Sequence, residues 1–224
     1  RPFRAQLDAT AANPDLDPEK LAGAEIGGEY QHGEIRLAVT GFVNKLKNAI
    51  ANVTLGQGPG VFPGVGFVAA GGAYRQRENV DGVKVRGLEA SAQWMHGPWL
   101  AQAGASWTHA RIEASGESLF LDGLRPAQTP NFAATVAFGY DQDGKGAQIV
   151  LRHVGAQFED DLNHRTLNAA TTFDAFASWP VTRRLQVIAR GENITNKLVM
   201  AGINGDGSVE RATPRTLWLG LRLR

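Results

Sequence analysis

The sequence has no cysteine, and its charges almost cancel: 23 Lys and Arg stand against 22 Asp and Glu, for a formal net charge of +1 at pH 7. Without cysteine there is no disulfide framework, no thiolate metal site and no cysteine nucleophile. Without a basic block there is no electrostatic reason to expect nucleic-acid binding. These absences exclude several function classes before any motif is considered.

A long hydrophobic run is absent as well. No apolar stretch approaches the ~18 to 20 residues that a membrane-spanning helix needs, which excludes a helical membrane protein. A transmembrane β-barrel stays open, because its strands alternate apolar and polar residues and their average hydropathy resembles that of a globular protein. The mean hydropathy of −0.23 is compatible with both classes.

What the sequence does contain is a period of two. Apolar and polar side chains alternate along residues 34–40, 147–152, 185–190 and 217–224, and helical spacing is nowhere sustained. The pattern predicts an all-β protein. Its nine expected strands cover residues 20–31, 34–47, 72–95, 98–113, 130–141, 146–157, 167–179, 185–194 and 212–224.

The links between these strands alternate in length. Short links lie at 31–33, 96–97, 141–145 and 180–184, and long links lie at 48–71, 114–129, 158–166 and 195–211. Hairpins of a β-sandwich have no reason to alternate so regularly, whereas a transmembrane meander has short turns on one membrane side and long loops on the other. The alternation therefore predicts an antiparallel, up-and-down transmembrane β-barrel wall.

Aromatic spacing supports the same interpretation. Trp99 and Trp107, like Phe132 and Tyr140, are eight residues apart on one face of a strand. Eight steps along a strand tilted by ~40° rise ~20 Å, close to the ~25 Å between the aromatic girdles of an outer-membrane barrel. The alternative is that two such pairs arise by chance, since aromatics are common in strands. The opposite face carries polar residues suited to a wet lumen: Gln102, Ser106, Thr108, Asn131 and Thr135.

Four motifs in order resemble the barrel of TonB-dependent outer-membrane receptors. They are residues 13–20 with 25–27 (Asn-Pro-x-Leu-x-Pro-Glu, then Glu-x-Gly), 79–89 (Asn-Val to Gly-Leu-Glu), 192–197 (Glu-Asn-Ile-Thr-Asn-Lys) and 213–216 (Thr-Pro-Arg-Thr). The resemblance spans nearly the whole chain. It marks the following as structural motif residues: Asn13, Pro14, Pro18, Glu19, Gly87, Glu89, Asn193, Asn196, Pro214 and Arg215.

The motif residues have physical roles that need no ligand. Pro14 and Pro18 lack amide donors, so their segment is expected in or near a loop and not in a central strand. Glu89 is expected to face the lumen and to pair with a lumenal Arg or with a polar group of a plug. Asn193 and Asn196 lie where a strand gives way to a loop, and Asn tolerates such turns.

The resemblance implies a 22-stranded barrel that encloses a plug. Residues 1–224 are then expected to be the C-terminal portion of that barrel, with the plug and the first strands absent, because nine antiparallel strands cannot close alone. The chain begins at Arg1 without a leader pattern, which suggests a mature protein or a fragment, and it ends on Leu223-Arg224 and not on the usual aromatic residue.

The resemblance also implies a function. A non-enzymatic outer-membrane receptor would take up a scarce ligand, such as a ferric siderophore, cobalamin or a glycan. Its partners would be that small-molecule ligand, outer-membrane lipid and lipopolysaccharide, and the TonB energy-coupling complex, reached through the missing N-terminal part. No cofactor, metal or nucleic acid is expected.

Candidate ligand contacts lie in two long loops. Tyr74, Arg75 and Arg77 follow a Gly-rich segment and could hold an anionic chelate, or else face lipopolysaccharide phosphates or solvent. His164 and Arg165 belong to the 158–166 loop, which could bind a cation or a polar ligand; we favour a charge run in solvent.

Two other function classes stay open. One is a passive porin-like or adhesin-type barrel, which a plug in the full-length protein would argue against. The other is a barrel hydrolase with Ser106 and either His109 or His153, although nothing in the sequence activates such a pair. The five His show no helical pair, which disfavours a zinc hydrolase.

Overall fold

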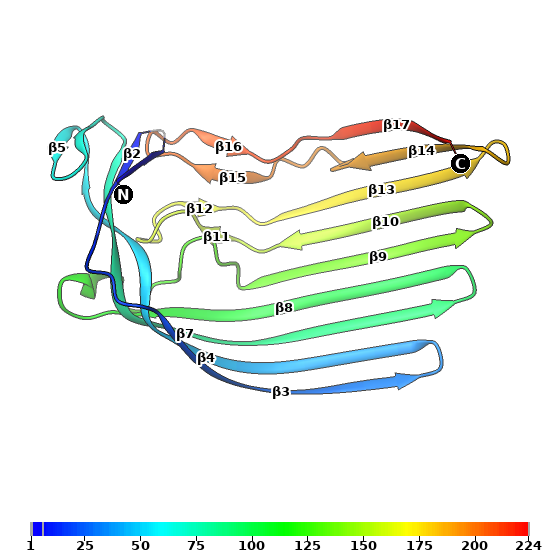
Figure 1. The fold of residues 1–224 in the computed structure, drawn as a ribbon, viewed down its shortest axis with the longest axis horizontal. Helices are drawn as coiled ribbons and strands as arrows, with labels where there is room; N and C mark the ends of the chain where they lie inside the picture. Colours follow the sequence, from blue (N-terminus) through cyan, green and yellow to red (C-terminus); the bar gives the residue numbers. More distant parts are fainter. Residues whose placement is uncertain (1, 6, 224) are drawn as a thin grey trace.

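A computed structural model describes residues 2–5 and 7–223. Nine antiparallel strands lie side by side in chain order and form a curved wall (Figure 1). They are β3 (Lys20–His32), β4 (Ile35–Gln57), β7 (Ala73–His96), β8 (Trp99–Glu113), β9 (Phe132–Gln142), β10 (Lys145–Val154), β13 (Ala170–Pro180), β14 (Leu185–Glu192) and β17 (Thr216–Leu223). In the described residues there is no helix long and apolar enough to cross a membrane.

Smaller elements occupy the long connections. Strand β2 pairs in parallel with the outer end of β7 and carries β1 beside it. Two-stranded ladders form between β5 and β6, β11 and β12, and β15 and β16. Their bounds are β1 (Phe3–Ala5), β2 (Asp8–Ala11), β5 (Gly60–Phe62), β6 (Gly66–Val68), the 3₁₀ helix η1 (Gly116–Leu121), β11 (Gln157–Phe158), β12 (Thr166–Leu167), β15 (Met200–Ile203) and β16 (Val209–Arg211).

The nine predicted strands are confirmed, with one large change in length. Strand β4 continues to Gln57, ten residues beyond its predicted end. It stays paired with β7 as far as Gln57 opposite Ala73. The glycines of this region had suggested a loop, but a full-length partner strand is available, and pairing with it outweighs the weak local preference. Strand β4 has two irregularities, the left-handed backbone at Asn48 and a bulge near Leu55, and these let the hairpin bend while it stays paired.

Short turns lie at one end of the wall and long connections at the other (Figure 1). The alternation of link lengths therefore describes the real arrangement. The β4–β7 hairpin extends past the other strands at the long-loop end. There its β5–β6 tip approaches the β15–β16 hairpin, since a Cβ added to Gly205 would overlap the Gly71 carbonyl oxygen.

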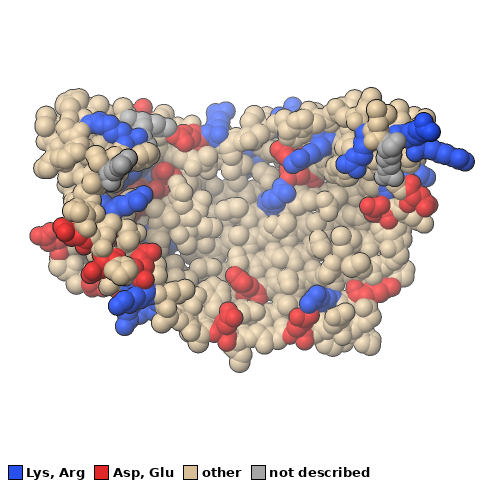
Figure 2. All heavy atoms as spheres, viewed as in Figure 1, with Lys and Arg blue, Asp and Glu red and all other residues tan. Residues whose placement is uncertain are grey.

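The two faces of the wall differ in character. Trp99 pairs with Tyr140, and Trp107 pairs with Phe132, so both aromatic pairs share one face and bracket its apolar rows. Between these rows no described residue on that face is charged. The opposite face is polar and carries charged residues within the wall, among them Glu25, Glu89, Arg152 and Asp174. Figure 2 shows acidic and basic side chains in the middle of the wall as well as at its ends. We call these faces outer and inner.

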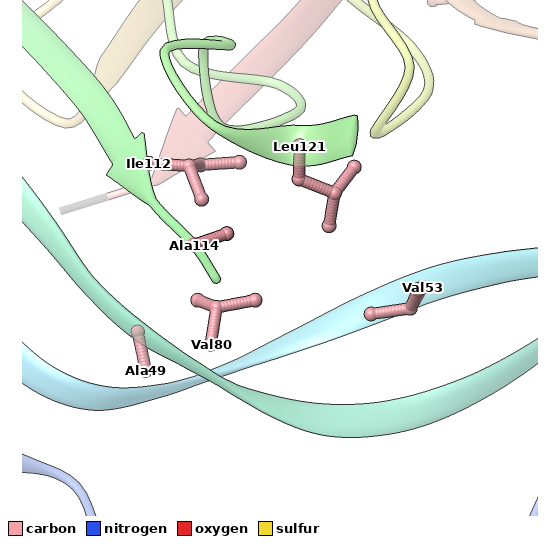
Figure 3. Close-up of a cluster of buried hydrophobic side chains, with 6 residues drawn as sticks. All are labelled: Ala49, Val53, Val80, Ile112, Ala114 and Leu121. Atoms are coloured by element: carbon pink, nitrogen blue, oxygen red, sulfur yellow. The ribbon is translucent and has the colours of Figure 1, made fainter. Parts of the chain in front are cut away.

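Apolar packing is concentrated at the long-loop end, because a one-layer wall has no interior of its own. One cluster joins the β4–β7 hairpin to β8 and η1 (Figure 3), with the buried residues Ala49, Val53, Val80, Ile112, Ala114 and Leu121. It lies on the inner side of the wall, where Leu46, Val83 and Ile112 share a row. The 114–129 connection thus folds inward over the mouth.

Candidate functional site

The long-loop end is held together first by the segment 12–19, which runs along the β4–β7 hairpin outside any strand. Asn13 donates a hydrogen bond from Nδ2 to the Arg77 carbonyl oxygen (2.9 Å) and accepts one at Oδ1 from the Asp15 amide (3.0 Å). Pro14 and Pro18 lie in this irregular segment, as predicted. Asn13 therefore acts as a clamp between the segment and β7.

A second clamp joins the first motif to the second, at Asn79. The Asn79 side chain accepts from the Asp17 amide (2.8 Å) and donates to the Asp17 and Asn48 carbonyl oxygens (3.0 and 2.7 Å). Glu19 accepts a hydrogen bond at Oε1 from the Ile50 amide (2.8 Å). The motifs at 13–20 and 79–89, which are far apart in sequence, thus bind each other.

The predicted ligand contacts on β7 take different positions. The ring of Tyr74 is buried and stacks on Phe62 with centroids 4.7 Å apart. Arg75 is half-buried, and its Nη1 forms an ion pair with Asp8 Oδ2 (2.9 Å). Arg77 is exposed. Both arginines line a cavity of about 380 Å³ together with Asp8, Asn13 and Asn52.

The 158–166 loop is not a solvated charge run, and that interpretation is wrong. Asp160 and Asp161 are only 5% and 8% exposed. Asp160 accepts hydrogen bonds from the amides of His164 (3.0 Å) and Arg165 (2.7 Å) and from Arg165 Nε (3.3 Å). The loop wraps around this carboxylate because buried backbone donors need an acceptor. His164 is exposed, and Arg165 also donates to the Ile203 carbonyl oxygen (3.2 Å).

Two carboxylates of this loop have shifted pKa values in opposite directions. Burial acts to raise the pKa of Asp160, but the His164 and Arg165 amides and the Arg165 guanidinium outweigh it and hold that pKa below its ordinary value. For Glu159 burial dominates and raises the pKa, against a hydrogen bond from Gln128. Asp160 is therefore charged at neutral pH and organises the loop.

One hydrogen-bonded chain connects the two predicted groups of ligand contacts. Asp161 accepts from the amide and the hydroxyl of Thr54 (2.8 Å each), and Arg75 Nε donates to the Thr54 hydroxyl (3.4 Å). Arg75 in turn pairs with Asp8. Sequence reasoning missed Thr54 and Asp8. No local signal marks either residue, since Thr54 and Asp161 are 107 residues apart in the chain.

The inner face carries Gly87 and Glu89 of the second motif, residues 79–89. A Cβ on Gly87 would lie 2.5 Å from both the Phe42 ring and the Trp107 carbonyl oxygen, so only glycine fits. Glu89 is exposed and lines a hollow of about 490 Å³ with Thr40 and Ser106. Its predicted lumenal position is confirmed, and among the residues the structure describes its carboxylate forms no ion pair.

The last two motifs join β14 to β17. Asn193 and Asn196 both adopt left-handed backbone, with φ of 46° and 52°. The buried Asn193 side chain exchanges hydrogen bonds with the amide and carbonyl of Lys197 (2.8 Å each), and Asn196 Oδ1 accepts from the Arg215 amide (3.2 Å). Arg215 and the preceding Pro214 lie directly before β17, so these motif residues set where the last strand begins.

The geometry does not support a hydrolytic centre. Ser106 shares the inner-face row of Thr40 and Glu89, whereas His109 lies on the outer face opposite Arg86. His153 is on the outer face as well, paired with Ala134, and its Nδ1 contacts the Thr171 hydroxyl (2.8 Å). Within residues 2–5 and 7–223 no group of His, Asp and Glu is arranged to hold a metal ion.

Fold, faces and loop asymmetry together define a segment of an outer-membrane β-barrel wall. Residues 3–194 match the family described as TonB dependent receptor-like, beta-barrel. The chain therefore belongs to the TonB-dependent receptor-like β-barrel family, whose members are outer-membrane proteins. The recognition, the fold class and the localisation inferred from the motifs are confirmed.

Three known proteins illustrate the likeness. The vitamin B12 transporter BtuB of Vibrio vulnificus (strain YJ016) is 24% identical over 188 residues, which cover 84% of this chain and 27% of that protein. The siderophore receptor PiuA from Acinetobacter baumannii superposes with a TM-score of 0.72 at 17% identity, over 93% of this chain and 29% of that chain. The ferric yersiniabactin uptake receptor FyuA from Yersinia pestis gives 0.71 at 17% identity, over 92% and 30%. The chain thus spans less than a third of each of these proteins.

Proposed function

We propose that this chain is part of the barrel of an outer-membrane receptor that takes up a scarce ligand by energy-coupled transport. The observation that carries the proposal is the wall itself: nine antiparallel strands with an outer face that is uncharged between its aromatic rows, a polar inner face and a packed cap of long loops. This arrangement belongs to a wide, water-filled barrel and not to a globular core.

The edges of the wall support a larger assembly. In the described part of the chain β3 pairs only with β4, and β17 pairs only with β14. Unpaired backbone amides and carbonyls cannot be left in lipid, so further strands must pair with both edges. We place residues 1–224 in the C-terminal portion of a 22-stranded barrel, with the plug and the first strands supplied by the rest of the receptor.

The ligand class follows from the family and from the mouth of the barrel. The relatives are named as receptors or transporters for siderophores, vitamin B12 and copper. At the mouth the two arginines on β7 border the cavity described above, and Arg77 has an exposed guanidinium. A ferric siderophore or another anionic chelate suits this charge, because arginine holds carboxylate and catecholate-like oxygens through charge-assisted hydrogen bonds. Cobalamin and a glycan are the further ligand classes.

The proposed roles at the mouth divide between contact and support. Arg77 and the exposed His164 contact the ligand, while Arg75, Arg165 and the buried Tyr74 hold the two loops in place. Outer-membrane lipid and lipopolysaccharide surround the barrel. The TonB energy-coupling complex engages a part of the receptor outside this chain.

The deciding experiment measures uptake by cells that make the full receptor. Radiolabelled ferric siderophores, cobalamin and oligosaccharides are supplied with and without a protonophore. Energy-coupled import predicts that accumulation of one ligand class stops when the proton-motive force is dissipated, while binding at the surface persists. A passive porin-like barrel, the alternative, would pass solutes equally under both conditions, and that result would refute the proposal.

The contact residues are tested in the same cells. Arg77→Gln should weaken surface binding of an anionic chelate by about ten-fold, the effect of one lost charge-assisted contact. Arg183→Gln, which removes an exposed cation from the β13–β14 turn at the opposite end of the wall, is the matched control and should bind normally. Equal binding by both variants would remove Arg77 from the ligand site.

A further inference from the structure

The outer part of the β4–β7 hairpin has two different faces. One face packs against η1 through the buried Val53. Neighbouring residues of a strand point to opposite faces, so Asn52 and its pairing partner Arg77 lie on the other face. Strand β2 adds Thr10 to that face, because Thr10 pairs with Arg75. Three strands that meet only in the folded chain therefore share one polar face.

The cavity of about 380 Å³ described above lies on this polar face. Segment 12–19 runs along the hairpin there. Leu16 of that segment and Phe3 of β1 are apolar residues in the lining. The volume is at the small end of the range of about 300 to 1,000 Å³ that ligand sites usually have. The cavity therefore suits a small molecule or one arm of a larger ligand.

Three polar side chains of the cavity are available to a ligand. In the described part of the chain, the Arg77 guanidinium, the Asn52 amide and the Thr10 hydroxyl have no hydrogen-bond or ion-pair partner. Directly paired residues have Cβ atoms about 4.5 to 5.5 Å apart, so Asn52 is within reach of a group that Arg77 holds. Asn and Thr side chains both donate and accept hydrogen bonds, which matches a hydroxyl group on the ligand.

The other charges of the cavity compensate each other. Arg75 Nη1 forms an ion pair with Asp8 Oδ2 (2.9 Å), and Asp8 Oδ1 accepts a hydrogen bond from the Ala73 amide (2.8 Å). Among the described lining residues, Arg77 is then the one cation without a counter-ion. A single carboxylate matches its planar guanidinium in charge and in shape, whereas a multiply charged group would keep uncompensated charge.

We propose that this cavity binds an aliphatic hydroxy acid, a small carboxylate with a neighbouring hydroxyl and a short alkyl chain. The carboxylate accepts two charge-assisted hydrogen bonds from Arg77. Asn52 and Thr10 bind the hydroxyl, and Phe3 and Leu16 cover the alkyl chain. Asn52 and Thr10 are the specificity-determining residues, because an acid without the hydroxyl loses their hydrogen bonds.

This inference rests on the proposed function, since it places the hydroxy acid at the proposed ligand site. The acid enters the cavity either as a free molecule or as one arm of a larger chelate. Binding to purified receptor is independent of import, so the pocket and energy-coupled uptake can fail separately.

A titration of the purified full receptor in detergent tests the proposal. The probe is leucic acid, the hydroxy analogue of leucine. Its matched analogues lack the hydroxyl (isocaproic acid) or the charge (the amide of leucic acid). Saturation-transfer NMR should show that the wild type binds leucic acid about ten-fold more tightly than the amide and about three-fold more tightly than isocaproic acid, as expected for one charged and one neutral contact.

Variants separate the two contacts. Arg77→Gln should lose the preference for the acid over its amide and keep the preference for the hydroxyl. Asn52→Ala combined with Thr10→Val should lose the preference for the hydroxyl and keep that for the charge. A misfolded receptor would keep neither. Asn131→Ala combined with Thr135→Val removes the same two groups outside the cavity and should keep both preferences.

A tailed probe distinguishes the two sources of the acid. Leucic acid is joined at its alkyl end to a polyether tail that is too long for the cavity. Equal affinity of the free and tailed acids supports an arm of a larger chelate. Binding of the free acid alone supports a small free molecule, and the hydroxy-acid pocket stands in both cases.

Two results would overturn the proposal. The first is equal affinity of the wild type for leucic acid and its amide. The second is a preference for the hydroxyl that persists when Asn52 and Thr10 are replaced together. Loss of energy-coupled uptake in cells, with both preferences intact in the purified receptor, would count against the proposed import and not against the pocket.

Discussion

At the residue scale, several motif positions of this wall are set by contacts and not by ligand chemistry. Gly87 leaves space for the Phe42 ring and the Trp107 carbonyl oxygen. A Cβ at this position would lie 2.5 Å from each. Asn193 and Asn196 supply left-handed backbone at the end of β14. These residues are needed for the path of the chain.

Gly87→Ala should destabilise the folded barrel by about 1 to 3 kcal/mol, because the added methyl group forces the sheet or the Phe42 ring to shift. The measurement is urea unfolding of the receptor in lipid vesicles. Gly104→Ala is the matched control on the same inner face, since a Cβ there meets nothing within 4 Å. Adding Phe42→Ala to Gly87→Ala should give a less than additive loss; strict additivity would contradict the proposed clash.

Acidification should loosen the 158–166 loop through Asp160. Its folded pKa lies below the ordinary value of 3.8, so the stabilisation by the charged carboxylate is complete above that pH and is lost as the pH falls through the folded pKa. Hydrogen exchange of the His164 and Arg165 amides, corrected for intrinsic rates, should therefore accelerate below about pH 4. Asp160→Asn should cost the loop about 1 to 3 kcal/mol at neutral pH and remove this acid dependence.

Glu159 gives the same loop a contribution of the opposite sign. Its folded pKa is raised above the ordinary value of 4.5, so protonation stabilises the loop as the pH falls through that higher pKa. Glu159→Gln isolates the Asp160 effect, because the uncharged amide does not titrate. If amide protection in this variant stays constant from neutral pH to pH 3, Asp160 does not organise the loop.

At the element scale, each strand separates two environments. Val136 pairs with Ala103 and Leu151 on the outer face, and its neighbour Thr135 pairs with Gly104 and Arg152 on the inner face. A shift of the register by one residue would exchange the two faces. The alternation therefore fixes the pairing register of each strand.

Val136→Arg should destabilise the barrel by roughly 2 to 4 kcal/mol, since it places a charge in the lipid near the midplane. Leu219→Arg on β17 should act in the same way, because Leu219 shares the outer face with Ala189. Thr135→Arg should be mild, as its side chain reaches the wet inner hollow. Unfolding in vesicles measures all three, and equal losses at positions 135 and 136 would show that the faces are assigned wrongly.

At the scale of the whole molecule, the wall is incomplete as a membrane structure. In the described residues, β3 pairs only with β4 and β17 only with β14, so each of these two strands has one edge without a partner strand. The inner hollow and the cap of loops belong to one wall, but a lumen requires closure. The proposed transport is therefore a property of the assembled barrel.

Residues 1–224 expressed alone should not form a heat-modifiable monomer in detergent or vesicles, because two open edges in lipid are strongly unfavourable. The full receptor refolded under the same conditions should show the usual shift in gel mobility between unheated and boiled samples. A compact, heat-modifiable monomer made from this chain alone would contradict the open-edge interpretation and the larger barrel with it.

The sequence predicted the wall more completely than the long-loop end, and the reason is physical. In the wall, a side chain at every second position faces either lipid or water, so local alternation carries the information. The common face of Trp99 and Trp107 could be expected from spacing alone. At the mouth, Asp160 and Asp161 are buried by loops and by Thr54, a residue of a distant strand. Charged residues in a loop looked solvated because their partners are remote in the chain.

The sequence by itself determined the strand number, the two faces and the loop asymmetry, because a strand between lipid and water shows them in its local alternation and turns. It also determined the family, through four short motifs in order. Only the tertiary structure decided how far the β4–β7 hairpin extends and that Glu19 and Asn79 hold the first motif against that hairpin. Those features arise from contacts between segments tens of residues apart, and the free energy of such contacts depends on geometry that no local pattern encodes.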